Sequence, residues 1–259
     1  MRKLVAGLLG LFWTVSLANA QDGGVFKILK LEGHQVRWQM SRNGEPRLVT
    51  YEVASTAVDI PGARNCRKIT KLDELASASR IDLVVLRAEL AAAFSLWEEV
   101  ANITFREAPA GTPPDILIGA QVEPEGWAFA DVFYDTASVE PVKPISRALV
   151  CLNPLRAWKI GFDGDLKRYD LRYTFAHEIG HAIGLDHPHG GDQIMGYRYE
   201  ERFRTLQEGD IRGAIALYGG ARDVAIDQAQ FDPGQAVGSA PDRHFAKRSG
   251  TRSLAPRAP

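Results

Sequence analysis

The stretch that decides the fold is residues 177–188, which read His177-Glu178-Ile179-Gly180-His181-Ala182-Ile183-Gly184-Leu185-Asp186-His187-Pro188. Histidines four positions apart lie on one face of an α-helix, so the rings of His177 and His181 can converge on a common point. The apolar residues of the same segment fall on the opposite face, at Leu171, Phe175, Ile179 and Ala182. The spacing therefore predicts a helix with one face in the core and a pair of metal ligands on the other.

Gly184 stands where this helix must end, because glycine tolerates the left-handed backbone that reverses a chain. The reversal brings His187 back as a third imidazole beside His177 and His181. Three histidines suit Zn²⁺, which accepts nitrogen ligands and keeps one position open for water in catalytic sites. Glu178 directly follows the first ligand, and we expect it to act as general base on the zinc-bound water during peptide hydrolysis.

Other interpretations of the histidines are weaker. A chance match to the five fixed positions, most of them rare residue types, is expected on the order of once in 10⁵ chains of this length. A purely structural zinc site usually has four ligands rich in cysteine, and residues 177–188 contain no cysteine. The nearby His189 is expected to be an exposed loop residue rather than a ligand.

The flanking sequence predicts an α/β (α+β) domain. Apolar residues at helical spacing predict helices over 81–101, 170–183 and 206–218, the last with a capping box of Thr205 and Glu208. Segments rich in β-branched and apolar residues predict strands at 48–53, 103–106, 115–119, 127–134 and 147–153. Because a helix separates the first strand from the others, we expect a mixed, mostly parallel five-stranded sheet with three helices.

The two ends of the chain differ from its middle. Residues 1–20 resemble a secretory signal peptide, with a basic start, an apolar run and the small residues Ala18-Asn19-Ala20; the alternative is a membrane anchor, for which the run is short. We therefore expect a secreted or periplasmic protein with no stable membrane insertion after cleavage. Residues 21–47 are expected to be an N-terminal extension, 48–220 the zinc-protease domain and 221–259 a mostly disordered tail.

Charge and cysteine content restrict the partners and the compartment. Lysine and arginine number 31 against 32 acidic residues, which gives no electrostatic reason to expect nucleic acid as a partner. Cys66 and Cys151 are the chain's 2 cysteines. They can form one disulfide in an oxidising compartment or remain two buried thiols, and the sequence leaves both possibilities open.

The zinc-binding segment also resembles the metzincin clan of zinc metalloproteases, and Ile194-Met195-Gly196-Tyr197 resembles the Met-turn of that clan. Within the clan, the similarity is closest to matrixin-type domains and covers residues 48–220. The resemblance implies a metzincin-like fold, one catalytic zinc ion and a monomeric endopeptidase acting on extended protein or peptide substrates. It also makes 127–134 the antiparallel edge strand of the active-site cleft, where Ala128 and Ala130 would offer backbone groups to the substrate.

Two departures from the matrixin pattern bear on the site. No histidine lies between Val36 and Ala176, so the second, structural zinc site of vertebrate matrixins has no ligands here, and the case for calcium (Ca²⁺) is weakened with it. The spacing of Met195 and Tyr197 is similar to that of serralysins and astacins, in which the tyrosine hydrogen-bonds the tetrahedral intermediate. This likeness assigns Tyr197 a catalytic role; the alternative is a tyrosine packed in the turn.

The function predicted from these features is a zinc-dependent endopeptidase, with the metal on His177, His181 and His187, and with Glu178 and Tyr197 as catalytic residues. Two other functions fit the same residues. One is a catalytically silent, zinc-stabilised envelope or matrix binding module, against which the intact Glu178 argues. The other is a zinc hydrolase of cell-wall peptide amides. Substrate preference depends on loop conformations that the sequence does not define.

Overall fold

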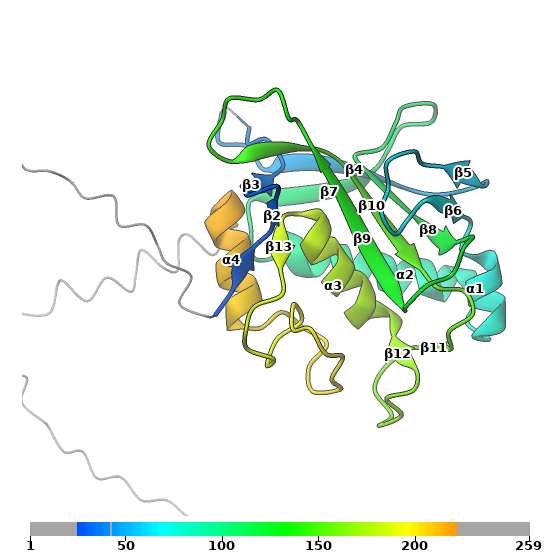
Figure 1. Ribbon diagram of the computed structural model, residues 1–259. Helices are drawn as coiled ribbons and strands as arrows, with labels where there is room; N and C mark the ends of the chain where they lie inside the picture. Colours follow the sequence, from blue (N-terminus) through cyan, green and yellow to red (C-terminus); the bar gives the residue numbers. More distant parts are fainter. Residues whose placement is uncertain (1–24, 42, 222–259) are drawn as a thin grey trace, which may run out of the picture.

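A five-stranded mixed sheet forms the centre of the molecule, in a computed structural model that describes residues 25–41 and 43–221 (Figure 1). Its strands follow the order β7-β4-β8-β10-β9, and neighbouring strands run parallel except at β9, which pairs antiparallel with β10 at the edge. The predicted sheet and its antiparallel edge strand are therefore confirmed. The bounds of these strands are β4 Arg47–Val53, β7 Ile103–Glu107, β8 Ile116–Gln121, β9 Ala128–Tyr134 and β10 Lys143–Leu152.

Two short hairpins extend the sheet to nine strands. In the first, β5 (Val58–Asp59) pairs with β6 (Lys68–Thr70), and β6 continues the sheet beside the end of β8. In the second, β2 (Lys30–Leu31) pairs with β3 (His34–Arg37), which runs parallel to the start of β10. These strands are too short to produce a periodic pattern, which is why the sequence did not indicate them.

Residues preceding the predicted domain boundary are part of the fold. Besides the second hairpin, β1 (Lys27–Ile28) pairs antiparallel with β13 (Leu185–Asp186), the segment that leads to His187. Val36 and Trp38 are buried in the main core, and the Trp38 indole donates a hydrogen bond to the Ala182 carbonyl at 3.0 Å. The described residues of the predicted N-terminal extension 21–47 thus include strands that pair with the turn before His187 and with the central sheet.

Two long helices cover one face of the sheet, α2 (Leu83–Glu98) and α3 (Leu171–Ala182) (Figure 1). They contact each other directly, since the buried Trp97 indole donates a hydrogen bond to the Ala176 carbonyl at 3.0 Å. α4 (Glu208–Tyr218) completes the three expected helices, and the short α1 (Asp73–Ala78) was not predicted. The capping box predicted for α4 is wrong: the box lies two residues later, with Gln207 as N-cap and Asp210 accepting from its backbone N–H at 2.9 Å.

The opposite face of the sheet is covered by the β5–β6 hairpin and its loop. A second apolar cluster lies there, formed by residues of the hairpin, β8 and β10. Cys66 and Cys151 form a disulfide within it, with Cα atoms 5.7 Å apart. This outcome decides between the two possibilities that the sequence left open.

Some predictions concern residues outside the described ranges. The signal peptide 1–20 and the tail 221–259 fall almost wholly there, with only Ala221 described. Among the helices that are described, none has the length and apolar character needed to cross a membrane.

The two remaining strands are β11 (Trp158–Lys159) and β12 (Tyr169–Asp170), which pair with each other in a parallel arrangement before α3.

Candidate active site

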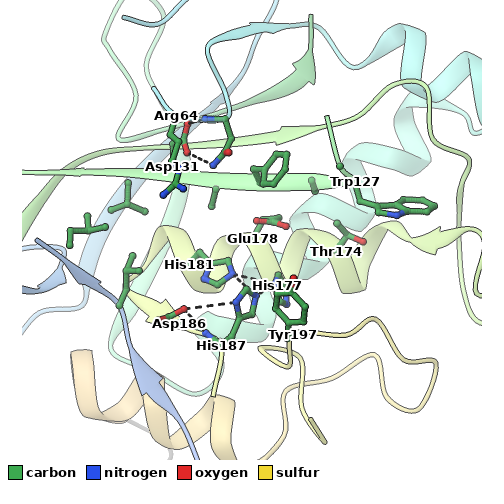
Figure 2. Close-up of a pocket in the computed structure, with 18 of the residues that line it drawn as sticks. Arg64, Trp127, Asp131, Thr174, His177, Glu178, His181, Asp186, His187 and Tyr197 are labelled. Atoms are coloured by element: carbon green, nitrogen blue, oxygen red, sulfur yellow. Dashed lines mark hydrogen bonds and ion pairs between the residues drawn. The ribbon is translucent and has the colours of Figure 1, made fainter. Parts of the chain in front are cut away.

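Helix α3 carries the first two histidines and the glutamate on its outer face (Figure 2). The helix begins at a defined place, because the Asp170 side chain accepts the Tyr173 backbone N–H at 2.9 Å as its N-cap. A second support is Arg204, whose guanidinium bonds both Asp170 oxygens at 2.9 and 3.0 Å. The direction in which His177 and His181 point is therefore fixed by the core on one side of α3 and by this N-cap at its start.

A tight turn after α3 returns the third histidine. Gly184 has a φ of 106°, and an added Cβ would lie 2.4 Å from the Val36 carbonyl oxygen, so glycine is required both by the backbone and by the close approach of β3. The Asp186 carboxylate accepts the His187 backbone N–H at 2.8 Å. The predicted reversal is confirmed, and His187 comes to face α3 (Figure 2).

The three imidazoles converge through their Nε2 atoms. His177 Nε2 lies 3.0 Å from that of His187 and 3.2 Å from that of His181, and the third side of this triangle is also 3.2 Å. His177 Nδ1 donates to the Ile194 carbonyl at 2.7 Å and His181 Nδ1 donates to the Leu185 carbonyl at 2.8 Å. Since a carbonyl can only accept, both neutral rings carry their proton on Nδ1 and turn an Nε2 lone pair to the common point.

This donor set fits a zinc ion. Tetrahedral Zn²⁺ with nitrogen at about 2.05 Å separates its ligand atoms by roughly 3.3 Å, close to the observed triangle. Burial lowers the pKa of His177 well below its ordinary value, and burial lowers that of His181 to about 4, with His187 adding to the effect. Burial also lowers the pKa of His187. All three rings are therefore neutral near pH 7, the state in which imidazole binds a metal.

Glu178 is a buried carboxylate beside these rings. Glu178 is 6% exposed. Within the described part of the chain, its side chain forms no hydrogen bond or ion pair. Burial raises the pKa of Glu178 to about 8, with a further contribution from Asp131 on β9. An unpaired buried carboxylate is costly unless a cation or a reacting group is its partner, which marks Glu178 as a functional residue.

The turn after the histidines packs against the same helix. Met195 is buried, and its sulfur lies so close to α3 that a Cβ on Gly180 would meet it at 2.2 Å. The Asp210 carboxylate fixes this turn by accepting the backbone N–H groups of Ile194 and Met195, both at 2.9 Å. Because the Ile194 carbonyl orients His177, Asp210 acts on the ligand set through the turn.

Tyr197 follows the turn and faces the third histidine (Figure 2). Its ring centroid lies 5.2 Å from that of His187, in an edge-on arrangement. The side chain is 80% exposed, so the tyrosine is not packed in the turn. A cleft of about 1090 Å³ lies in front of these residues, and both Glu178 and Tyr197 line it.

The edge strand β9 forms one lip of this cleft. One edge of β9 pairs with β10, and no described strand pairs with its other edge, which leaves backbone groups of Ala128 and Ala130 on the cleft side. At the start of β9, stacked aromatic rings line the cleft. The centroid of the Tyr169 ring is 3.8 Å from that of Trp127 and 4.1 Å from that of Tyr199. This wall can accept an apolar side chain.

Sequence reasoning found the three histidines, Glu178 and Tyr197, and the structure brings all five to one cleft. His189, as expected, is exposed and is not part of the histidine cluster. Three features were missed: the supporting role of Asp210, the buried Asp131 near Glu178, and the N-terminal hairpin. The Glu32-Gly33 pair between two short apolar-polar segments was a hairpin signal that could have indicated the last.

The fold and the site together define the class of protein, a metzincin-type peptidase domain: a mixed sheet with an antiparallel edge strand above a helix that presents converging imidazoles and a carboxylate. The matrixin family model matches residues 74–219 of the chain. The chain belongs to the matrixin family, as its zinc-binding segment and Met-turn indicated.

Curated relatives agree with this assignment. Matrix metalloproteinase-B of Caenorhabditis elegans is 30% identical over 177 residues, which cover 57% of this chain and 34% of the relative. Matrix metalloproteinase-19 of Mus musculus is 30% identical over 146 residues, covering 54% and 26%. Stromelysin-2 of Rattus norvegicus is 31% identical over 135 residues, covering 49% and 27%. The chain thus spans about a third or less of the length of these relatives.

Proposed function

We propose that this protein is a zinc-dependent endopeptidase whose metal is held by His177, His181 and His187. The observation that carries the proposal is the triangle of Nε2 atoms beside Glu178, a buried carboxylate without a described partner. Membership of the matrixin family and the names of the matched metalloproteinases support the same activity and the same metal.

The residues of the chain divide the work of hydrolysis. When bound, a zinc ion would supply a Lewis acid that polarises the scissile carbonyl and lowers the pKa of water. Glu178 takes the proton from the attacking water and passes it to the nitrogen of the leaving amine, so that no covalent enzyme intermediate is needed. Burial raises the pKa of this carboxyl group, which makes its protonated form accessible for the donating step. The Asp210 contacts with the Met-turn keep His177 in place during these steps.

Substrate binding is assigned to the free edge of β9. An extended peptide can add there as an antiparallel strand, bonded to the backbone of Ala128 and Ala130. Tyr197 is exposed at the mouth of the site, and we assign its hydroxyl the role of donating to the oxygen that gains charge as the peptide carbon becomes tetrahedral. The substrate class is therefore an extended protein or peptide chain, bound by a monomer.

Export is the location that fits these features. The signal-like residues 1–20 and the disulfide between Cys66 and Cys151 both suit a secreted or periplasmic protein. The same disulfide favours an oxidising compartment independently of the N-terminal segment.

Replacement of Glu178 tests the proposal directly. Glu178→Ala, loaded with zinc, is expected to bind about one ion per chain as the wild type does, and to lose cleavage of an unfolded protein by on the order of 10³-fold or more. Zinc content is measured by elemental analysis and cleavage by peptide-library digestion with and without a chelator. Undiminished turnover in this variant would refute the role of Glu178. Cleavage confined to cell-wall fragments would favour an amide hydrolase, and metal-dependent products from neither substrate would favour a silent binding module.

A further inference from the structure

The hairpin of β2 and β3, together with the strand β1 that precedes it, lies at one end of the active-site cleft. We call these residues, 27–37, the N-terminal hairpin. The family match begins at residue 74, so this hairpin lies outside it. Three contacts hold the hairpin to the turn before His187: the β1–β13 pairing, the Leu29 backbone N–H donating to the Gly184 carbonyl at 2.8 Å, and an ion pair of 2.6 Å between Lys27 and Asp186. The hairpin is therefore a fixed wall of the cleft.

Three side chains of this hairpin line the cleft, those of Leu29, Leu31 and Glu32. The Tyr134 hydroxyl, at the far end of β9, donates to Glu32 at 2.8 Å. A peptide that adds antiparallel to β9 places its N-terminal part beside the C-terminal end of that strand. The hairpin therefore faces the residues on the N-terminal side of the cleaved bond, away from the aromatic wall at Trp127.

Glu32 occupies an unusual position for a glutamate. Its φ is 50° and that of Gly33 is 86°, the left-handed pair of a two-residue hairpin turn. Asparagine, aspartate and glycine normally occupy such positions, because glycine has no Cβ to clash with the backbone and the short polar side chains of the other two hydrogen-bond locally. Strained backbone of this kind is concentrated at functional sites. The conformation directs the carboxylate of Glu32 to Tyr134 at the end of the cleft.

The charges around the cleft single out Glu32. Asp186 is neutralised by Lys27, and the buried Asp131 accepts the backbone N–H groups of Asn65 and Cys66, both at 2.8 Å. Glu32 has the Tyr134 hydroxyl as a partner but no ion pair with any cationic side chain in the described ranges. Its carboxylate therefore retains acceptor positions for a cation from outside the chain.

Arg64 also lines the cleft and carries a positive charge, but it lies on the opposite side of β9 from the N-terminal hairpin. It precedes Asn65 and Cys66 in the loop that covers the face of the sheet opposite the helices, where Phe129 and Phe133 of β9 pack. Tyr134 packs against the main core on the helix side. Because side chains of an extended peptide alternate between the two sides, Glu32 and Arg64 face different substrate residues.

We propose that Leu29, Leu31 and Glu32 form a subsite for a lysine or arginine side chain of the substrate, on the N-terminal side of the cleaved bond. A basic side chain has an apolar stem and a charged tip, which match two leucines followed by a carboxylate. The stem packs on Leu29 and Leu31, and the cation pairs with Glu32 while Tyr134 holds the carboxylate. This subsite rests on the proposed function and names the substrate class of the same cleft.

The test compares the zinc-loaded full chain with Glu32→Gln, which keeps an acceptor for Tyr134 and removes the charge. Library digestion first locates the preferred position, and matched peptides with lysine or norleucine there are then compared. Wild type is expected to cleave the lysine peptide with about fivefold higher kcat/KM, and Glu32→Gln to cleave both equally. The preference should shrink as salt is raised, since exposed ion pairs are screened. Lys30→Gln, on the same hairpin but away from the cleft, is the matched control and should keep the preference.

A binding measurement separates this subsite from the catalytic proposal. In a Glu178→Gln background, which is expected not to cleave, fluorescence anisotropy gives the dissociation constants of the lysine and norleucine peptides. These constants should differ by about fivefold, and the difference should disappear when Glu32→Gln is added. Cleavage that depends on Glu178 but shows no basic preference, or a preference that survives Glu32→Gln, overturns the subsite alone. If wild type neither cleaves peptides in a Glu178-dependent manner nor binds the lysine peptide more tightly, both proposals fall. If the protein binds the lysine peptide more tightly but cleaves neither peptide, the subsite is supported and the proposed endopeptidase activity is refuted.

Discussion

At the scale of single residues, burial separates groups that act on substrate from groups that hold the site. Glu178 is buried with no described partner, while Asp210 is buried with three backbone N–H groups around it. Burial raises the pKa of both carboxyl groups, but in Asp210 the hydrogen bonds work against that rise. Glu178 can therefore exchange a proton with substrate, whereas the carboxylate of Asp210 is held by its hydrogen bonds and stabilises the structure.

Tyr197 gives the sharpest prediction at this scale. Tyr197→Phe is expected to lower kcat by on the order of 10²-fold with little change in KM, because a donor to the developing charge acts only in the transition state. The side chain is 80% exposed, so the thermal unfolding temperature should not change. Steady-state kinetics on one peptide and a melting curve measure both. An unchanged kcat would show that the tyrosine only borders the cleft.

The histidines and Glu178 could be read from the sequence because they follow from spacing within one short segment, whereas Tyr197 was found through the resemblance to serralysins and astacins. The effect of Asp131 on the pKa of Glu178 could not be read in this way, since it depends on how β9 lies over α3. For Asp210, the sequence likewise indicated only a position near the start of a helix, and not its contacts with the Met-turn. Contacts between distant segments leave no periodic signal.

At the scale of elements, the strands and helices that carry a pattern were predicted, and those without one were missed. β-branched runs located the central strands within a few residues, and apolar spacing located α2, α3 and α4. The six-residue α1 and the two-residue strands of the N-terminal hairpin are too short for either pattern. The α4 capping box was placed at Thr205 and Glu208 because local rules cannot see that Asp210 also binds the Met-turn.

The link between α4 and the Met-turn can be cut by one substitution. In Asp210→Asn, the new amide group must face a backbone N–H that the carboxylate accepted, because both of its oxygens are in use. The free energy of unfolding should fall by about 2 kcal/mol. Zinc affinity should fall about tenfold, since Ile194 orients His177. Urea unfolding and zinc titration measure the two effects.

Glu208→Gln is the matched control at the start of α4. Its carboxylate is largely exposed and, among the residues that the structure describes, forms an ion pair with Arg212 alone, which is also exposed, so neither stability nor zinc affinity should change appreciably. If both variants behave alike, the Met-turn does not depend on Asp210.

At the scale of the whole molecule, the disulfide and the metal-ligand cluster stabilise opposite faces of one sheet. Cys66 and Cys151 are separated by 85 residues and lie in the second apolar cluster, away from the histidines. Replacing both cysteines with alanine should lower the free energy of unfolding by about 4 kcal/mol, because a long loop is no longer closed in the unfolded chain. Urea unfolding of the variant and of the wild type, with and without reductant, measures this; reduction should move the wild type to the curve of the variant.

Removal of the metal tests the other face. The Nε2 atoms of the three rings lie within 3.2 Å of one another, and their positions are fixed by α3, the turn after it and the Met-turn. Zinc at about 1,000 times its dissociation constant should therefore stabilise the fold by about 4 kcal/mol, which corresponds to a melting temperature about 10 °C higher than in chelator. His187→Ala should lose most of this shift, whereas Glu178→Gln should keep it. An equal shift in His187→Ala would mean that the ion binds elsewhere, because only the histidine triangle requires that residue.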